Sequence, residues 1–308
     1  GIIRCVGDAD ARFNEDALRI MRAIRFASEY GFKIEENTSK AIRNNYKLLE
    51  NVSMERISAE LNKMIVGKTA GKLLVQYKEV FGYIIPELVP SFGMNQDNPH
   101  HDKNVWEHIC AVVDNCEPML DLRLASLFHD IGKPYCKTID QKGIGHFYGH
   151  AEKSVLLSNE IMHRLRQPND LIDGVSTLVK YHDRLGNIGE KGIRRLYGKL
   201  GSDMMQKLVM ISYADIMGQS KHNRKKKLEN LEKVKSIIDK IEEDNLCCKG
   251  SQLEINGNDI IGLGFLPGKI IGEILDDLLE NVISGELKNE KEELMEYVRR
   301  KYDAHTKL

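Results

Sequence analysis

The stretch RFNEDALRIMRAIRFASEYGF, residues 12–32, sets the fold class of this chain. Its apolar residues, among them Ile20, Met21 and Ile24, recur every three or four positions. That spacing is typical of a helix with one buried face, and it predicts a helix near residues 15–30. The same periodicity continues along the chain and predicts further helices near residues 37–49, 53–66 and 69–80.

The face opposite the apolar one carries charged groups at a strict spacing of three: Asp16, Arg19, Arg22 and Arg25. Asp16 is expected one helical turn before Arg19. One interpretation is a solvated face with a weakly stabilising Asp–Arg pair, and spacing alone favours it. The alternative is a template that reads nucleotide bases, because a carboxylate accepts from exocyclic amines and a guanidinium donates to ring nitrogen and carbonyl acceptors. The later arginines would then contact phosphates.

The 308 residues allow about two domains, and 45 basic residues nearly balance 46 acidic ones, which argues against a global polycation. Strand-like alternation is scarce, so we expect an all-α fold, an elongated string of small helical bundles. The Pro-rich and polar stretch IIPELVPSFGMNQDNPHHD, residues 84–102, marks the first boundary. The expected domains are residues 1–92, 93–220 and 221–308. Six cysteines without a CxxC pair indicate the cytoplasm, and no apolar run approaches the roughly 18 residues of a membrane span.

The first helix belongs to a longer string. Residues 7–38, GDADARFNEDALRIMRAIRFASEYGFKIEENT, followed by VSMERISAELNKMI, resemble the neck of class II tRNA nucleotidyltransferases, the CCA-adding and poly(A) polymerase family. Glu15, Asp16 and Arg19 match the family's Glu-Asp-x-x-Arg motif, and ERISAEL matches a later motif that supports the neck. The resemblance implies that Asp16 and Arg19 select CTP and then ATP, that Arg22 and Arg25 contact the nucleotide, and that tRNA is a partner.

The same family carries its transfer chemistry in an N-terminal head, where two aspartates on a strand bind Mg²⁺. We expect that this chain lacks such a head and is a fragment, with a separate head chain as a further expected partner. The sequence DAD at residues 8–10 has the spacing of that motif, but only seven residues precede it and it abuts a helix. Phosphoryl transfer of this kind needs metal ions to neutralise the triphosphate.

The middle of the chain carries a second series of polar residues, each within an apolar helical stretch: His108, His129, Asp130, His150, His182 and Asp215. A single histidine on an apolar helix is more often a core residue than a ligand, but six such groups together favour a metal site. The order of these residues, with HDIGK at the centre, resembles that of HD-domain metal-dependent phosphohydrolases.

That resemblance implies a central metal-binding bundle with two ions of a transition metal such as Ni, Co, Mn, Fe or Zn. One ion would be held by His108, His129, Asp130 and Asp215, and Asp130 would bridge to a second ion held by His150 and His182. Lys133 would neutralise a phosphate oxygen. His146 is an alternative ligand to His150. In one branch of CCA-adding enzymes such a domain is linked to hydrolysis of 2′,3′-cyclic phosphates and phosphomonoesters.

Two other functions remain open at this point. The chain could be an RNA-binding accessory protein with an inert HD scaffold, or a free-standing HD phosphohydrolase whose neck motif then has no explanation. The basic cluster KHNRKKK, residues 221–227, fits either a tRNA-backbone contact or a solvated helix face. Trp106 is expected in the core rather than at a base-stacking surface.

Overall fold

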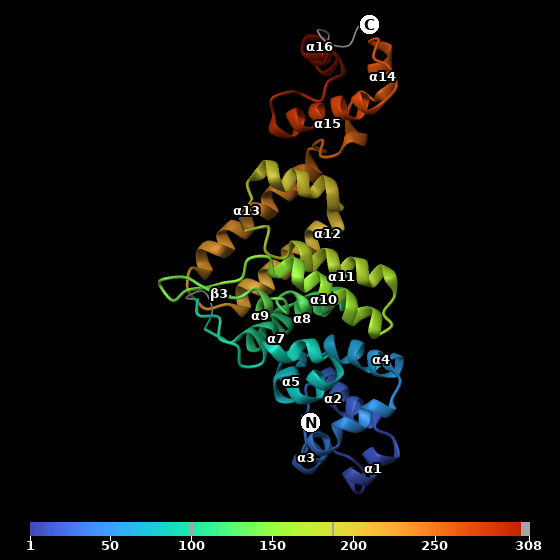
Figure 1. The fold of residues 1–308 in the computed structure, drawn as a ribbon, viewed down its shortest axis with the longest axis vertical. Helices are drawn as coiled ribbons and strands as arrows, with labels where there is room; N and C mark the ends of the chain where they lie inside the picture. Colours follow the sequence, from blue (N-terminus) through green and yellow to red (C-terminus); the bar gives the residue numbers. More distant parts are fainter. Residues whose placement is uncertain (99–101, 187, 303–308) are drawn as a thin grey trace. The chain divides into compact units, whose positions relative to one another are not determined.

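The computed structural model describes residues 1–98, 102–186 and 188–302. The chain forms two compact units. The first contains residues 1–184 and 207–229, and the second contains residues 185–206 and 230–308. Helices dominate both units, which confirms the all-α class (Figure 1). In the described part of the chain, strands are limited to two short pairs, and no helix has both the length and the apolar character needed to cross a membrane.

The N-terminal part of the first unit is built from short amphipathic helices. They are α1 (Ala9–Glu15), α2 (Leu18–Tyr30), α3 (Glu36–Asn45), α4 (Met54–Ile65), α5 (Ala70–Gln76) and α6 (Lys78–Ile84), with the 3₁₀ helices η1 (Tyr46–Asn51) and η2 (Pro86–Ser91). Strand β1 (Ile2–Ile3) pairs in parallel with β2 (Lys33–Ile34). The apolar face predicted from the opening stretch is buried: Ile20, Met21 and Ile24 are fully enclosed.

The helix predicted near 15–30 begins three residues later than expected, and a separate helix, α1, ends at Glu15 before it. Asp16 has extended backbone angles at the end of α1, and α2 begins only at Leu18. The Asp16 carboxylate accepts a hydrogen bond from the backbone N–H of Leu18 at 3.2 Å. A side-chain oxygen that accepts from one of the first backbone N–H groups stabilises a helix start. Asp16 therefore lies between the two helices, outside the helix that carries the arginines.

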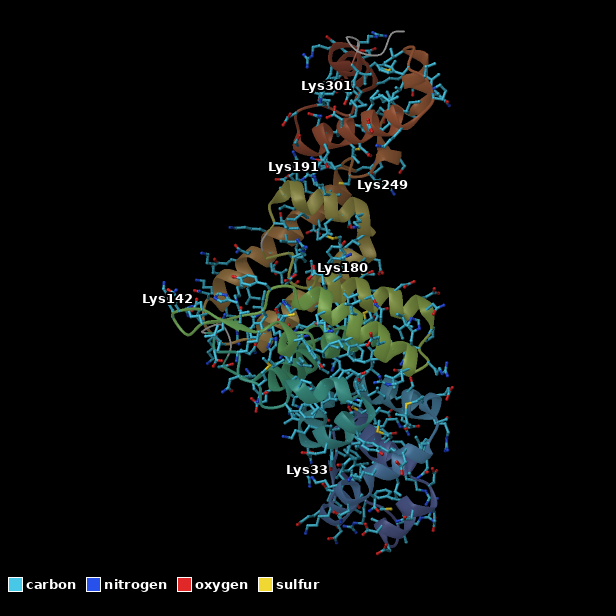
Figure 2. The ribbon with its side chains drawn as sticks, in the orientation of Figure 1. Lys33, Lys142, Lys180, Lys191, Lys249 and Lys301 are labelled. Atoms are coloured by element: carbon cyan, nitrogen blue, oxygen red, sulfur yellow. The ribbon has the colours of Figure 1, made fainter. Side chains whose placement is uncertain are left out.

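The central bundle also belongs to the first unit. It is formed by α7 (Val105–Asn115), α8 (Leu120–Phe128), α9 (Lys133–Cys136), α10 (His150–Arg164), α11 (Asn169–Tyr181) and the later part of α12 (Glu190–Gly218). Strands β3 (Thr138–Ile139) and β4 (Gly145–His146) form an antiparallel hairpin. Lys142 lies at the tip of this hairpin, which projects from the helices (Figure 2). Trp106 is buried against Phe92, at 4.9 Å between ring centroids, as expected for a core residue.

The neck helices and the central bundle pack closely within this unit. A Cβ atom on Gly71 would lie 2.0 Å from the backbone carbonyl oxygen of Cys110 in α7, so only glycine fits there. The Gly71 N–H donates to the Asp114 carboxylate at 2.7 Å. After α10, the Gln167 amide forms hydrogen bonds of 2.8 to 3.1 Å with Ser58 and Asn62 of α4. Helices α4 and α5 are thus joined to the bundle by specific polar contacts that are at least partly buried.

The second unit has its own apolar core. It contains the early part of α12, most of α13 (Arg224–Glu243), the 3₁₀ helix η3 (Gly250–Gln252), α14 (Gly257–Gly262), α15 (Lys269–Ser284) and α16 (Lys291–Tyr302). Its core includes Ile255, Ile260, Ile274 and Leu278. Arg194 donates to the carbonyl oxygens of Cys247 and Ile283 and ties three segments of this unit together.

Candidate metal centre and nucleotide-recognition helix

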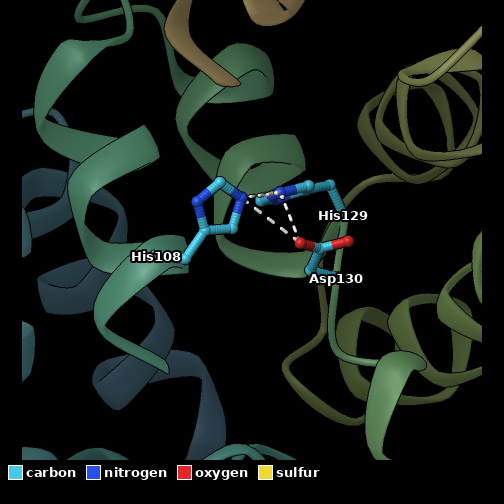
Figure 3. A group of neighbouring side chains, drawn as sticks. All are labelled: His108, His129 and Asp130. Carbon is cyan, nitrogen blue, oxygen red and sulfur yellow. Dashed lines mark hydrogen bonds and ion pairs between the residues drawn. The ribbon is translucent and has the colours of Figure 1, made fainter. Parts of the chain in front are cut away.

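The histidines and aspartates of the central series converge on one point inside the bundle. They come from five helices or helix ends: His108 from α7, His129 and Asp130 from the end of α8, His150 from the start of α10, His182 from the end of α11 and Asp215 from α12. Figure 3 shows His108, His129 and Asp130 drawn together. Two groups have ligand atoms within 4.8 Å of one another: His108, His129 and Asp130, and Asp130, His150 and His182.

Asp130 is the residue shared by the two groups. Its Oδ2 lies 3.3 Å from Nε2 of His108 and 3.2 Å from Nε2 of His129. Its Oδ1 lies 3.5 Å from Nε2 of His150 and 3.9 Å from Nε2 of His182. The carboxylate is buried and presents one oxygen to each pair of imidazoles. This is the arrangement of a carboxylate placed to bridge two cations.

Hydrogen bonds fix the orientation of three of these rings. In His129, His150 and His182, the Nδ1 atom lies 2.7 to 2.9 Å from the backbone carbonyl oxygen three residues earlier. A carbonyl only accepts, so Nδ1–H is the donor and the neutral ring keeps its lone pair on Nε2. The three lone pairs therefore face Asp130. Metal-bound histidines are held in the same way by their second nitrogen.

The distance between facing histidines tests whether a metal fits. The Nε2 atoms of His150 and His182 are 3.3 Å apart, and so are those of His108 and His129. Two neutral rings that both present lone pairs, as His150 and His182 do, cannot hydrogen-bond to each other. Two nitrogens bound at about 2.0–2.1 Å to one tetrahedral ion would lie about 3.3–3.4 Å apart. Imidazole and carboxylate donors suit Mn, Fe, Co, Ni or Zn, so the residues fit a transition metal.

Asp215 and Lys133 complete the centre. Oδ1 of Asp215 lies 3.0 Å from Nε2 of His108, and its Oδ2 accepts from Gln219 at 2.7 Å. Nζ of Lys133 lies 2.7 Å from Oδ2 of Asp130 and donates to Gln96 at 2.8 Å. The lysine is buried, so its ammonium position is fixed by these two contacts.

The electrostatics of this centre keep its carboxylates ionised but shift two of its histidines in opposite directions. Burial would lower the pKa of His108, yet its hydrogen bonds with Asp130 and Asp215 raise it. Burial alone would raise the pKa of Asp130, but its close contacts with His129 and Lys133 hold it well below its usual range. Asp215 is partly buried, which would raise its pKa, but its contacts with His108 lower it. Burial lowers the pKa of His182, which favours the neutral imidazole. Ionised carboxylates and neutral imidazoles are the forms that bind metal.

A pocket of about 390 Å³ opens onto this centre. Its lining includes Asp130, Lys133, His150, His182 and Asp215. Drug-sized and nucleotide-sized ligands occupy pockets of roughly 300–1,000 Å³. The pocket therefore has room for a small phosphate ester next to the candidate ligands.

Sequence reasoning missed two glutamines that contact the pocket side chains Lys133 and Asp215. Gln96 lies in the polar stretch interpreted only as a domain boundary, and Gln219 has no motif around it, so neither gave a signal. His146, the alternative to His150, lines the pocket but lies outside both candidate ligand groups. Its Nε2 instead lies 3.0 Å from the Asp140 carboxylate. The geometry thus brings His150, rather than His146, to Asp130.

The residues predicted to recognise nucleotides lie at and after the junction of α1 and α2. Glu15 and Arg19 form an ion pair at 2.7 Å, and the same guanidinium nitrogen donates to the carbonyl oxygen of Arg12 at 2.9 Å. The Asp16 carboxylate lies 3.7 Å from Arg56 of α4. Glu15, Asp16, Arg19 and Arg22 all keep part of their side chains in solvent. They form a partly exposed, charged surface.

Arg25 does not share that surface, contrary to the expectation that all three arginines face solvent. It is only 8% exposed. Its Nε lies 2.7 Å from Oε2 of Glu60, a buried residue of the ERISAEL motif, and its guanidinium stacks over Phe26 at 3.9 Å. Arg22 approaches the other oxygen of Glu60 at 3.5 Å. Helical periodicity could not reveal this, because the partner comes from α4.

The basic cluster 221–227 is only partly solvated. Arg224 donates to the carbonyl oxygens of Met217 and Gln219, and Lys227 donates to the Gln219 side chain. Lys221, Lys225 and Lys226 are exposed. Two of the cations therefore hold the segment after α12 against the bundle, and three are available to solvent.

The sequence of this chain is similar to two protein families and to several known enzymes. Residues 31–91 match the family described as "Probable RNA and SrmB- binding site of polymerase A", and residues 152–298 match that described as "tRNA nucleotidyltransferase domain 2". A CC-adding tRNA nucleotidyltransferase of Thermus thermophilus is 28% identical over 90% of this chain, and a CCA-adding enzyme of Pediococcus pentosaceus is 30% identical over 96%. These matches support the CCA-adding enzyme family.

The chain matches only part of the length of these relatives. The chain spans 65% and 63% of the lengths of these two relatives. Among solved structures, the Bacillus stearothermophilus CCA-adding enzyme in complex with CTP matches with a TM-score of 0.63 at 22% sequence identity. The match covers 98% of this chain and 66% of the chain of that enzyme. The Thermotoga maritima CCA-adding enzyme complexed with tRNA has a TM-score of 0.54 at 19% identity, covering 97% and 64%. These likenesses show a shared helical fold.

Proposed function

We propose that this chain is the nucleotide-selecting and tRNA-binding part of a cytoplasmic CCA-adding tRNA nucleotidyltransferase, with an HD domain that hydrolyses 2′,3′-cyclic phosphates or phosphomonoesters. In this proposal residues 1–92 form the neck and an RNA-binding helical domain, 93–220 the HD domain, and 221–308 a helical tail. CTP, ATP and tRNA are the partners. Nucleotide transfer itself would take place with Mg²⁺ on a nucleotidyltransferase head, carried on the same or a separate chain.

The neck supports the transfer role. Asp16 and Arg19 are partly exposed at the α1–α2 junction, where a base edge can reach a carboxylate and a guanidinium together. Arg22 extends the charged surface, whereas the buried Arg25 would act by holding α2 against α4 rather than by direct contact. Residues 31–91, which follow these side chains in the sequence, match a family described as a probable RNA-binding site, and this supports the proposed tRNA binding.

The test of base selection joins this chain to the nucleotidyltransferase head of a CCA-adding relative. A good bidentate contact discriminates between bases by about 1–3 kcal/mol, so Asp16→Ala or Arg19→Ala should raise misincorporation roughly ten- to a hundredfold. Lys40→Ala removes an exposed cation of α3 and serves as the control. If both variants choose CTP and ATP as the unmodified protein does, the charged surface is only a solvated face.

The metal centre supports the hydrolase role, and the observation that carries it is the position of Asp130 between two pairs of histidine Nε2 atoms. A transition metal bound there supplies Lewis-acid activation of water and of the phosphate. Asp130 stays ionised and orients both pairs of imidazoles. The ammonium of Lys133, which Gln96 holds at the pocket, would neutralise a phosphate oxygen.

The reaction is a substitution at phosphorus. In a 2′,3′-cyclic phosphate, a bond forms between the water oxygen and phosphorus while the bond from phosphorus to the 2′ or 3′ oxygen breaks. The released ribose oxygen takes up one proton, and the product is a phosphomonoester. The pocket beside Asp130 and Lys133 has the volume to hold such a substrate.

Two measurements on the 308-residue chain test this role. Metal analysis after reconstitution with Ni²⁺, Co²⁺ or Mn²⁺ should find near-stoichiometric metal, and Asp130→Ala should lose at least one ion and reduce hydrolysis to background. His163→Ala removes an exposed imidazole from the same helix as His150 and should change neither. Circular dichroism must show equal helix content in both variants.

The outcome also separates the two alternatives. No metal and no activity would favour an RNA-binding accessory protein with an inert bundle. Metal-dependent hydrolysis combined with normal base selection in the Asp16 and Arg19 variants would favour a free-standing phosphohydrolase.

A further inference from the structure

The rim of the metal pocket carries an exposed aromatic pair that the hydrolytic chemistry does not use. The rings of His146 and Tyr148 stack with centroids 5.5 Å apart and planes only 5° from parallel. Both residues line the pocket, yet Tyr148 is 78% exposed. Its hydroxyl lies 3.5 Å from Nδ1 of His146, at the outer limit of a hydrogen bond. The exposed ring of Tyr148 therefore lies at the edge of the pocket and stacks on the ring of His146.

The surrounding hairpin holds this pair in place. The Asp140 carboxylate contacts His146 at 3.0 Å and accepts hydrogen bonds from the backbone N–H groups of Lys142 and Ile144. The Gly145 N–H donates to the Asp97 carbonyl oxygen at 2.7 Å, and a Cβ on Gly145 would lie 2.2 Å from the Gln96 carbonyl oxygen. The hairpin is thus anchored to the loop that also positions Lys133 through the Gln96 side chain.

The pair is also close to the candidate metal ligands. Tyr148 precedes His150 by two residues, a span of at most about 7 Å along the chain. Phe147, next to Tyr148 in the chain, accepts the Nδ1–H of His150 on its carbonyl oxygen, and its ring lies 5.2 Å from Nζ of Lys133. A ligand with its phosphate at Lys133 can therefore reach Tyr148 with an attached group.

We propose that the stacked Tyr148–His146 pair is a nucleobase platform, and that the substrate of this pocket is a nucleoside or RNA-terminal phosphate rather than a small ester without a base. This inference rests on the proposed hydrolase function of the same site. Aromatic side chains at the edge of a phosphate-binding site commonly stack on bases, and they do so with little preference among bases. A single exposed aromatic residue would be ordinary on its own. Its parallel backing by His146 and its place in the pocket lining are what indicate a ligand.

The test compares two cyclic phosphates that undergo the same ring opening: adenosine 2′,3′-cyclic phosphate and glycerol 1,2-cyclic phosphate. Tyr148→Ala should raise KM for the adenosine ester about tenfold and leave its kcat unchanged, because stacking binds the base but does not touch phosphorus. The kinetics of the glycerol ester should not change. Tyr148→Phe keeps the ring and should behave as the unmodified protein. Tyr135→Ala removes an exposed tyrosine outside the pocket and is the control.

Calorimetric titration with adenosine 3′-phosphate and with glycerol phosphate tests the platform without catalysis. We expect Tyr148→Ala to weaken binding of the adenosine compound about tenfold and to leave binding of glycerol phosphate unchanged. If the unmodified protein hydrolyses neither cyclic ester, the hydrolase function fails, and the titration still decides the platform. Equal KM and equal Kd for the adenosine compounds in the unmodified protein and Tyr148→Ala would overturn the inference.

Discussion

The buried carboxylate of Glu60 offers the sharpest test of how the neck is held together. Its Oε2 lies 2.7 Å from Nε of Arg25 and its Oε1 lies 3.5 Å from Arg22. Glu60→Gln keeps the shape of the side chain but removes its charge, so the buried guanidinium of Arg25 loses its main counter-ion. Removing one partner of a buried ion pair costs about 3–5 kcal/mol. Because Glu29 remains 3.3 Å from Arg25, we expect the lower end, about 3 kcal/mol.

The measurement is urea unfolding followed by tryptophan fluorescence. The chain has a single tryptophan, Trp106, which is buried in the first unit, so its signal reports on that unit. The control is Glu55→Gln in the same helix, which breaks an exposed pair with Arg166 at 3.8 Å and should cost less than about 1 kcal/mol. Adding Arg25→Met to Glu60→Gln should recover part of the loss, since no cation is then left buried alone. A Glu60→Gln variant that unfolds at the same urea concentration as the unmodified protein would refute the reasoning.

Three further outcomes can be measured by the same method. Gly71→Ala should destabilise the first unit by several kcal/mol because its Cβ would overlap the α7 backbone, whereas Gly174→Ala, in open space within α11, should stabilise it by up to about 1 kcal/mol. Gln167→Ala leaves the polar groups of α4 without their partner and should cost about 1–3 kcal/mol at an unchanged dependence on urea. Burial would raise the pKa of Glu87, but the hydrogen bond from Arg164 lowers it by more. This pair therefore stabilises the fold above the unfolded pKa of about 4.3, and its contribution is lost as the pH falls. Glu87→Gln should lower the free energy of unfolding at pH 7 and make that free energy fall less steeply in acid.

The neck shows where sequence reasoning succeeds and where it stops. Periodicity identified the buried face of α2 correctly, because burial of Ile20, Met21 and Ile24 is a property of the helix itself. It placed Arg25 in solvent, since the carboxylate that buries it lies 35 residues later on α4. It also started the helix near residue 15 instead of at Leu18, because nothing in the periodicity marks the extended backbone of Asp16.

The metal centre shows the same division. The residue types and their helical settings indicated the six ligand candidates, and the structure brings them together around Asp130. Which of His146 and His150 approaches Asp130 depends on a hairpin of two-residue strands, too short to give a pattern. Gln96 and Tyr148 were equally invisible, because their roles come from the anchoring of that hairpin on a distant loop. Whether the centre binds metal and hydrolyses phosphate remains a prediction.

The contact of Gly71 with α7 and the hydrogen bonds of Gln167 with α4 hold the neck helices against the bundle that carries the histidines around Asp130. Both parts belong to one compact unit. Unfolding of either part is therefore expected to unfold the other. A substitution deep in the bundle that raises the unfolded fraction would expose the whole unit to proteases and lower the amount of protein several-fold for a loss of about 1–2 kcal/mol. Under the proposed function, cells with such a variant would accumulate immature tRNA although the altered residue touches neither nucleotide nor RNA.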